Sequence, residues 1–370
     1  MLVCMLVAVE IIVRIAAHAG YATIRNFETK NQVEPVTFLG DIDSRFGVWH
    51  KANAAVTVDT PQGPVTYETN AQGMRDRPRA EKSTAAERVV VLGDSFIEGS
   101  YVEESDRITD VLEKTTGVEF LNFGTSGNFG SIQEWLLYEH LAKNFDHSRV
   151  CVFLLPANDF TDNDPAMNPP ARYRPYLQET AGTYKVSYPV AFAPATTGMS
   201  RTMSPGRIFR HMLYNHWYSL NLIVLRDISE VVDLFRRTTI TSSYDTYTPV
   251  DLSRMLFTYR QILDIAGHRP VHIVVIPRDS DFLAHRAGRF EGKITAALSA
   301  FAKEYPGLDV IDLLPYFLNY AKTHGISYKR FFLEHDAHWS PLGHRVAAKA
   351  VLEALETRQF KAQATWPAGG

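Results

Sequence analysis

The sequence predicts an α/β protein built on a doubly wound parallel sheet. From residue 89 onward, short apolar runs with the length of buried strands alternate with longer helix-like stretches. Such alternation requires right-handed crossovers, which place helices on both faces of the sheet. The expected strands are 89–93, 118–123, 149–155, 271–277 and 308–313, and the expected helices are 105–116, 130–143, 251–267, 290–304 and 341–356.

The N-terminus reads MLVCMLVAVEIIVRIAAHA. As a helix this run would be about 28 Å long, close to the thickness of a hydrocarbon core, so we expect a membrane anchor helix within residues 1–24. Glu10, Arg14 and His18 fall on one stripe of that helix, where Glu10 and Arg14 can form an ion pair. The alternative is an amphipathic helix that lies on the folded domain. An anchor would leave the main domain in the periplasm or another extracytoplasmic space.

The rest of the chain divides by composition. Residues 25–85 are polar and irregular, as is typical of a connector or extension, and the main domain should cover 86–358. Within it, 160–250 is too long for a plain connection and is expected to form a lid or subdomain. Its aromatic residues suit stacking on sugar rings or packing of the insertion itself. Residues 359–370 are expected to be a disordered tail.

Composition excludes some functions. The 370 residues carry a net charge of -3 and no basic block, which argues against a nucleic-acid partner. Cys4 and Cys151 are far apart, so the sequence contains neither a disulfide framework nor a zinc-ligand spacing. We expect no cofactor, and the oligomeric state is left open.

The first residue with a chemical role is expected at the end of the strand Val89–Leu92. Gly93 frees the backbone there, Asp94 follows, and Ser95 stands where the strand turns into a helix. Ser95 could be a nucleophile or only a hydroxyl that caps the helix. A serine becomes a useful nucleophile only when a base takes its proton and a carboxylate orients that base.

A candidate base lies in FFLEHDAHWSPLGH. Ser340 and Pro341 predict a helix start, as N-cap and first helical residue. Asp336 and His338 precede it, and in an extended segment residues two apart point to the same side. Asp336 can therefore orient His338 toward Ser95. The alternative is a metal site formed by His335, Asp336 and His338.

Acyl transfer also needs hydrogen-bond donors for the oxyanion. Gly127 in NFGTSGN and Asn158 in PAND both follow a predicted strand. In a parallel sheet, the carboxyl ends of the strands share one edge, where ligands bind. Gly127 could instead serve only a turn, and Asn158 could only cap a helix.

Four motifs in this order resemble the blocks of the SGNH, or GDSL-type, hydrolases: GDS at 93–95, Gly127 of TSGN, Asn158 of PAND, and the D-x-H of 336–338. The resemblance spans about residues 88–355. TNAQGMRDR followed by a strand and GDSFIEG also resembles a bacterial membrane-anchored subgroup associated with surface polysaccharides. Two departures are Pro156-Ala157 before Asn158 and an Asp–His spacing of two rather than three.

The resemblance implies a flavodoxin-like fold with strand order 2-1-3-4-5 and a serine esterase mechanism. Ser95 would be the nucleophile, with His338 and Asp336 completing the triad. The backbone amides of Ser95 and Gly127 and the side chain of Asn158 would form the oxyanion hole.

The expected activity is removal of small O-acyl groups, usually acetyl, from carbohydrate. The first alternative is an O-acetyltransferase that acts on an exported polysaccharide, in which a sugar hydroxyl replaces water. The second is a catalytically silent polysaccharide-binding or assembly protein, which would not need the intact set of polar residues. Lipid and thioester substrates also stay open.

Overall fold

The computed structural model describes most of the chain. The described residues are 2–19, 41–60, 63–84, 87–167, 173–192, 209, 213, 216–225, 241–333 and 336–356.

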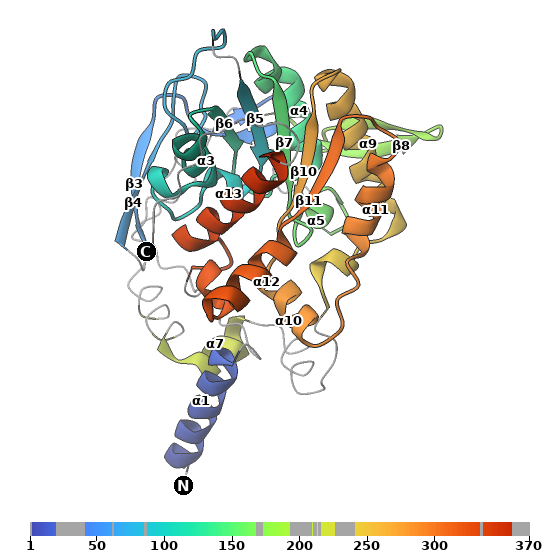
Figure 1. Cartoon of the computed structure of the whole chain (residues 1–370). Helices are drawn as coiled ribbons and strands as arrows, with labels where there is room; N and C mark the ends of the chain where they lie inside the picture. Colours follow the sequence, from blue (N-terminus) through green and yellow to red (C-terminus); the bar gives the residue numbers. More distant parts are fainter. Residues whose placement is uncertain are drawn as a thin grey trace.

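A five-stranded parallel sheet forms the centre of the molecule (Figure 1). Its order is β11-β10-β7-β5-β6, which is the predicted order 2-1-3-4-5 when these strands are counted along the chain. The predicted fold class is therefore confirmed. The strands are β5 (Arg88–Gly93), β6 (Glu119–Gly124), β7 (Arg149–Leu154), β10 (Val271–Val275) and β11 (Leu308–Asp312). Most of their side chains are buried on both faces, as the near-continuous apolar runs require.

Helices cover both faces of this sheet (Figure 1). α3 (Ile108–Thr116), α12 (Leu313–His324) and α13 (Pro341–Glu356) pack together on one face, and α4 (Ser131–His140) packs against α9 (Pro249–Ala266) on the other. The remaining helices that follow sheet strands are α2 (Ser95–Glu98), α5 (Asp159–Asp162), α10 (Asp279–Arg286) and α11 (Lys293–Ala302). A helix was expected at Ser95, where α2 begins, and one was considered after Asn158, where α5 lies, but α10 and α12 were not predicted. α12 begins directly after β11, and Asp312 is both the last residue of the strand and the N-cap of the helix, where its carboxylate accepts from the Leu314 amide at 3.0 Å.

The start of α13 matches its prediction. Pro341 is the first helical residue, and the Ser340 hydroxyl accepts a hydrogen bond from the Gly343 amide at 3.3 Å. The same hydroxyl donates to the Arg330 carbonyl at 2.6 Å. Ser340 therefore ties the helix start to the preceding loop.

Residues 41–84 form more structure than a connector. They contain two antiparallel hairpins, and the loops after the hairpins reach into the domain. Phe46, Trp49 and Met74 from this segment are part of the main hydrophobic core. The strands are β1 (Asp41–Asp43), β2 (Gly47–Trp49), β3 (Ala55–Thr60) and β4 (Gly63–Glu68). This part of the chain therefore belongs to the folded domain.

The insertion 160–250 is described in part. Its hairpin, β8 (Tyr176–Thr180) with β9 (Thr183–Ser187), contacts α9 through Tyr184 and Phe257, whose ring centroids are 5.3 Å apart. Its helix α7 (Tyr218–Leu225) packs against α1 (Figure 1). Several of the predicted stacking aromatics pack within the domain, such as Tyr173 on Tyr188 at 5.0 Å. The lid stays a prediction, because much of the insertion lies outside the described residues.

The N-terminal helix α1 (Leu2–His18) projects from the domain next to α7 (Figure 1). The predicted ion pair is confirmed, with Arg14 Nε 2.8 Å from Glu10 Oε1. Glu10 also accepts hydrogen bonds from the Tyr218 and Ser219 amides at 2.9 Å each. Among the described residues, no helix is both long and apolar enough to cross a membrane. Residues 20–24 of the expected anchor and the tail 359–370 lie outside the described part.

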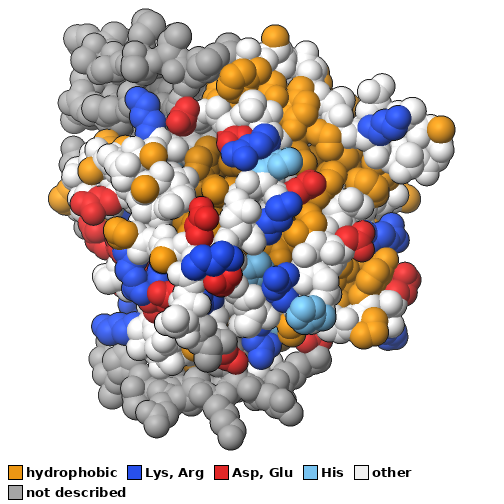
Figure 2. Space-filling model, turned by 90° about the horizontal axis from the view of Figure 1, so that it is seen from above, with side chains coloured by type: hydrophobic (Ala, Val, Ile, Leu, Met, Phe, Trp, Pro, Cys, Tyr) orange, Lys and Arg blue, Asp and Glu red, His pale blue; other side chains and the backbone are white. Residues whose placement is uncertain are grey.

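Charges on the surface are mixed. On the face seen in Figure 2, Lys and Arg side chains lie among Asp and Glu side chains, and no large area of one sign stands out. This distribution agrees with the small net charge of -3.

His344 on α13 is a buried ionisable group in the core. Its ring contacts Trp339 edge to face, with centroids 5.4 Å apart. Burial lowers the pKa of His344 to about 3, with further lowering by the nearby positive charges, including Arg75 and Arg107. The ring is therefore neutral in the folded protein, whereas in the unfolded chain it takes up a proton below about pH 6.5. Its contribution to stability is present above that pH and is lost as the pH falls toward 3.

We predict that His344→Gln reduces the loss of stability in acid. Between pH 6.5 and 4, the unfolding free energy of the wild type should fall more steeply than that of the variant, by up to about 1.4 kcal/mol per pH unit. Urea denaturation at a series of pH values measures both slopes. Above pH 7.5 the slopes should coincide, which serves as the internal control. Equal slopes across the acid range would contradict a buried, neutral His344.

Candidate active site

Ser95 lies at the carboxyl end of the central strand β5, as the first residue of α2. Asp94 is the N-cap, and its carboxylate accepts from the Phe96 amide at 2.9 Å. Helix capping is therefore done by Asp94 and not by Ser95. A Cβ at Gly93 would lie 2.4 Å from Cγ1 of Ile97, so only glycine allows α2 to fold back so closely on β5.

The structure brings Ser95, His338 and Asp336 into one chain of contacts. His338 Nε2 is 2.8 Å from Ser95 Oγ, and His338 Nδ1 is 2.5 Å from Asp336 Oδ1. Asp336 Oδ1 also accepts from the His338 amide at 2.7 Å. Because a carboxylate only accepts, Nδ1 carries the hydrogen and Nε2 is free to accept from the serine hydroxyl.

The charge of Asp336 is stabilised by its neighbours. Burial would raise the pKa of Asp336, but His338 and its hydrogen bonds outweigh burial and lower that pKa to about 2. Arg278, in the loop after β10, acts in the same direction. Asp336 is therefore ionised at neutral pH and can hold the histidine ring in one tautomer.

Two aromatic rings fix the position of His338. Phe96 lies with its ring centroid 5.1 Å from that of His338, and Tyr101 contacts the imidazole edge to face at 5.7 Å. Tyr101 has a positive φ of 64°, which is unusual for an aromatic residue. Its amide donates to the Tyr67 hydroxyl at 2.6 Å, a contact that supports this backbone conformation. Neither ring is among the site residues predicted from the sequence, although their positions one and six residues after Ser95 were the available signal.

Asn158 lies on the same edge of the sheet and is joined to the residue before Ser95. Its Nδ2 donates to Asp94 Oδ2 at 3.2 Å, which leaves the second amide hydrogen for another acceptor. Asn158 occupies the N-cap position of α5, but its side chain makes no capping hydrogen bond. The side chain of Asn158 therefore does not cap the helix. Burial raises the pKa of Asp94, and the bonds from Phe96 and Asn158 oppose that effect.

Gly127 lies in the loop after β6, the strand next to β5. Its φ is 99°, a conformation that favours glycine. Among the described contacts, none joins Gly127 directly to Ser95 or Asn158. The loop is tied to β5 instead through the Thr125 amide, which donates to the Gly93 carbonyl at 3.3 Å.

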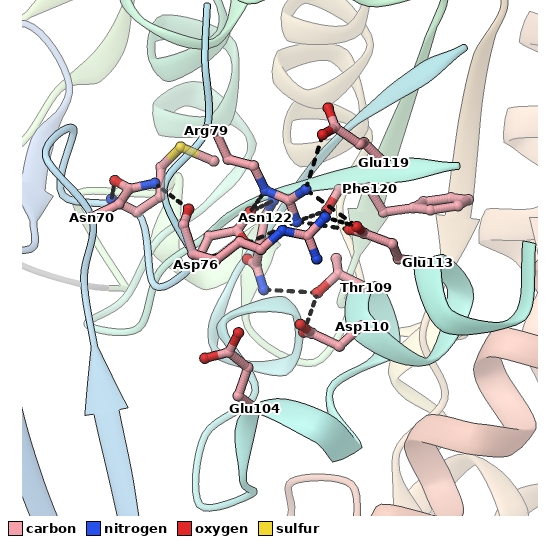
Figure 3. Close-up of polar contacts among 12 residues, drawn as sticks. Asn70, Asp76, Arg79, Glu104, Thr109, Asp110, Glu113, Glu119, Phe120 and Asn122 are labelled. Atoms are coloured by element: carbon pink, nitrogen blue, oxygen red, sulfur yellow. Dashed lines mark hydrogen bonds and ion pairs between the residues drawn. The ribbon is translucent and has the colours of Figure 1, made fainter. Parts of the chain in front are cut away.

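Buried polar side chains hold the other end of α2. Asn122 on β6 donates to the Ile97 carbonyl at 2.8 Å, and Arg75 donates to the Glu98 carbonyl at 3.0 Å. Asn122 is itself held by Asp76, whose Oδ2 accepts from the Asn122 amide at 3.1 Å. Figure 3 shows Asp76 and Asn122 together with Arg79 and its acidic partners Glu113 and Glu119. Arg75, Asp76 and Arg79 come from the TNAQGMRDR segment.

The metal alternative is only partly covered by the structure, because His335 lies outside the described residues. Within the described part of the chain, no group of three or more His, Cys, Asp or Glu side chains could hold a metal ion. The side chains of Asp336 and His338 form a hydrogen bond with each other, and His338 forms another with Ser95.

Residues 276–367, which include Asp336 and His338, match the family model of the SGNH hydrolase-like domain of acetyltransferase AlgX. No curated protein matches the chain.

Among solved structures, a G-D-S-L family lipolytic protein from Veillonella parvula is similar, at 16% identity and a TM-score of 0.39 over 74% of this chain and 100% of that one. A lipase/acylhydrolase from Enterococcus faecalis has 13% identity and a TM-score of 0.40 over 75% and 100%. A family 3 carbohydrate esterase from Clostridium thermocellum has 8% identity and a TM-score of 0.36 over 73% and 98%.

The family match contains the histidine and the aspartate, and the sheet order brings the serine of the GDS turn to them. Residues 276–367 are therefore similar to an SGNH hydrolase-like domain, and the fold and the contacts of Ser95 agree with that similarity.

Proposed function

We propose that the protein removes small O-acyl groups, acetyl above all, from carbohydrate by a serine mechanism. The observation that carries the proposal is the pair of short contacts made by His338, 2.8 Å to Ser95 Oγ and 2.5 Å to Asp336 Oδ1. Both lie within the reach that proton transfer requires.

The chemical steps follow from this arrangement. Ser95 Oγ attacks the acyl carbonyl carbon while His338 Nε2 takes the hydroxyl proton, and Asp336 stabilises the resulting imidazolium. The negative charge on the carbonyl oxygen is stabilised by the Ser95 and Gly127 amides and by the free hydrogen of Asn158 Nδ2. His338 then gives its proton to the leaving sugar hydroxyl. Water, activated by the same histidine, hydrolyses the acyl-enzyme and restores Ser95.

The alternative is an O-acetyltransferase on an exported polysaccharide, and the name of the matched family model supports it. The same residues act in both reactions, and only the last step differs, in which a sugar hydroxyl attacks the acyl-enzyme instead of water. A non-catalytic polysaccharide-binding protein is disfavoured, because binding does not need a serine, histidine and aspartate in contact.

The test is a reaction of the full chain with acetylated oligosaccharides, with and without an unacetylated oligosaccharide as acceptor. We expect release of acetate, and a product in which the acceptor gains acetyl would instead identify the transferase. Ser95→Ala should lower turnover by roughly 10³-fold or more, because no described hydroxyl other than that of Ser95 lies within hydrogen-bond distance of His338 Nε2. Ser299→Ala, at an exposed serine on α11, is the matched control. Undiminished turnover by Ser95→Ala would contradict the proposal and direct attention to the metal alternative, which a chelator tests.

Asn158→Ala should lower kcat by roughly 10²–10³-fold with little change in KM, because an oxyanion donor acts on the transition state more than on the bound ester. Steady-state kinetics with an acetyl ester measure both constants, and Asn144→Ala on the surface is the control. A change confined to KM would make Asn158 a binding residue, and wild-type kinetics would remove it from the mechanism.

We also propose that α1 attaches the enzyme to a lipid bilayer, with the catalytic domain on the extracytoplasmic side. Glu10 on α1 pairs with Arg14 and accepts a hydrogen bond from the Ser219 amide. The other faces of α1 are apolar and exposed. The exposed apolar side chains are Met5, Leu6, Val7, Val9, Ile11, Ile12 and Ile15. Such a continuous apolar surface is typical of a segment that contacts membrane or another protein.

Introduction of charge should release the protein from lipid. The double variant Ile12→Asp/Ile15→Asp should lose co-sedimentation with vesicles of phosphatidylcholine and phosphatidylglycerol, because a charged side chain in the hydrocarbon region costs roughly 2.5–3.5 kcal/mol. The control is Met167→Asp/Val250→Asp, which charges two exposed apolar positions in the main domain. Equal sedimentation of all three proteins, or none by the wild type, would rule out lipid attachment through α1.

A further inference from the structure

A buried histidine and a buried glutamate lie side by side behind the candidate site. His50 follows β2, Glu98 is the last residue of α2, and both side chains are at most 1% exposed. His50 Nε2 is 2.9 Å from Glu98 Oε1, and His50 Nδ1 is 2.8 Å from the Gly73 carbonyl. None of the chemical steps above uses either residue.

The contacts fix where the hydrogens of this pair are. A carbonyl only accepts, so His50 Nδ1 must donate to Gly73. Nε2 and the carboxylate oxygen of Glu98 then need one further hydrogen between them, carried by either partner. His50 and Glu98 are therefore joined by one hydrogen bond. Both groups satisfy each other in the interior, where an unpaired charge would be costly.

The pair joins three segments that are far apart in the chain. Glu98 belongs to the helix that begins with Ser95, and Gly73 belongs to the loop after β4. Thr125 Oγ1, in the loop that leads to Gly127, is 3.1 Å from His50 Nε2. His50 and Glu98 therefore contact both backbone segments that would supply oxyanion donors, α2 and the loop after β6.

A second connection runs through two serine hydroxyls. Ser100 Oγ donates to Glu98 Oε2 at 3.2 Å and lies 3.3 Å from Ser126 Oγ. Ser126 directly precedes Gly127, and Gly127 and Asn128 both have positive φ, 99° and 63°. Consecutive residues in this region form an uncommon backbone conformation, which persists only where surrounding contacts determine it.

We propose that His50 and Glu98 are positioning residues that hold the Ser95 and Gly127 amides in the arrangement that binds the oxyanion. The inference rests on the proposed acyl-transfer function. Stability alone is a weak explanation of the pair, because apolar residues of similar volume often replace a buried ion pair without loss of stability. A role in positioning the oxyanion donors explains the pair better than stability does, because a shift of about 1 Å in a catalytic group can lower the rate about 10²-fold.

The test compares substitutions that keep or remove the hydrogen bonds. His50→Phe retains a planar ring but removes the hydrogen bond to Glu98 Oε1, and we expect kcat to fall roughly 10- to 100-fold with KM nearly unchanged. Glu98→Gln can still donate to His50 and accept from Ser100, so it should keep kcat within about 3-fold of the wild type. Ser100→Ala removes the connection to Ser126 and should give an intermediate loss. It also serves as the second variant if His50→Phe does not fold.

The matched control is His272→Phe, which replaces another buried histidine, one that faces Asp309 at 3.6 Å near the amino ends of β10 and β11. It should change stability without a change in kcat. Wild-type kcat in folded His50→Phe and in Ser100→Ala would overturn the proposal. So would an equal loss in His272→Phe, which would mark a general effect of destabilisation.

A readout without turnover separates this inference from the proposed function. In the Ser95→Ala background, hydrogen exchange of amides 123–129 should become faster when His50→Phe is added and should stay unchanged when His272→Phe is added. If the wild type turns over no ester at all, the proposed function fails, and exchange still decides whether the pair holds the loop. Unchanged exchange in both double variants would refute the positioning role.

Discussion

The close approach of α2 to the ends of β5 and β6 is the constraint on which the candidate site depends. A Cβ at Gly124 would lie 2.2 Å from the Glu98 amide nitrogen, and one at Gly93 would lie 2.4 Å from Ile97. α2 has four residues, so it contains almost no hydrogen-bond ladder of its own. The position of Ser95 is therefore determined by what surrounds the helix.

Buried polar side chains hold the carboxyl end of α2 in place. The carbonyls of Ile97 and Glu98, which a longer helix would satisfy internally, accept from Asn122 and Arg75. Burial lowers the pKa of Arg75 to about 10, so the guanidinium is still charged at neutral pH and lies at the negative end of the helix. Its other face stacks on the Tyr67 ring at 3.6 Å. A segment that precedes the sheet in the chain thus completes the turn that carries Ser95.

The sequence predicted what depends on local patterns. Apolar runs separated by helical stretches predicted the sheet and its faces, because burial on both sides leaves a clear periodic signal. The two-residue spacing of Asp336 and His338 predicted their contact, because an extended backbone puts both side chains on one side. In both cases the partners are close in sequence or are marked by repetition.

What was missed depends on partners that are distant in sequence. TNAQGMRDR was interpreted as a connector because polar and charged residues are usually exposed. Its charges are buried because they are paired: Arg79 donates to Glu113 across 34 positions, and Asp76 accepts from Asn122 across 46. His50 is likewise paired with Glu98 across 48 positions. No local pattern distinguishes such residues from a solvated loop.

The same long-range pairing connects the N-terminal helix to the candidate site. Lys329 donates to the carbonyl of His18, the last residue of α1, and Arg286 at the end of α10 donates to the carbonyl of Ala19, which follows the helix. α10 begins directly after Arg278, whose charge acts on Asp336. The eight residues of α10 span about 12 Å. α10 therefore lies between the contacts of α1 and the loop that carries Arg278 beside the candidate site. If α1 attaches to a bilayer, these contacts would set the distance between Ser95 and the membrane surface. The substrates within reach of Ser95 would then be those held close to the membrane.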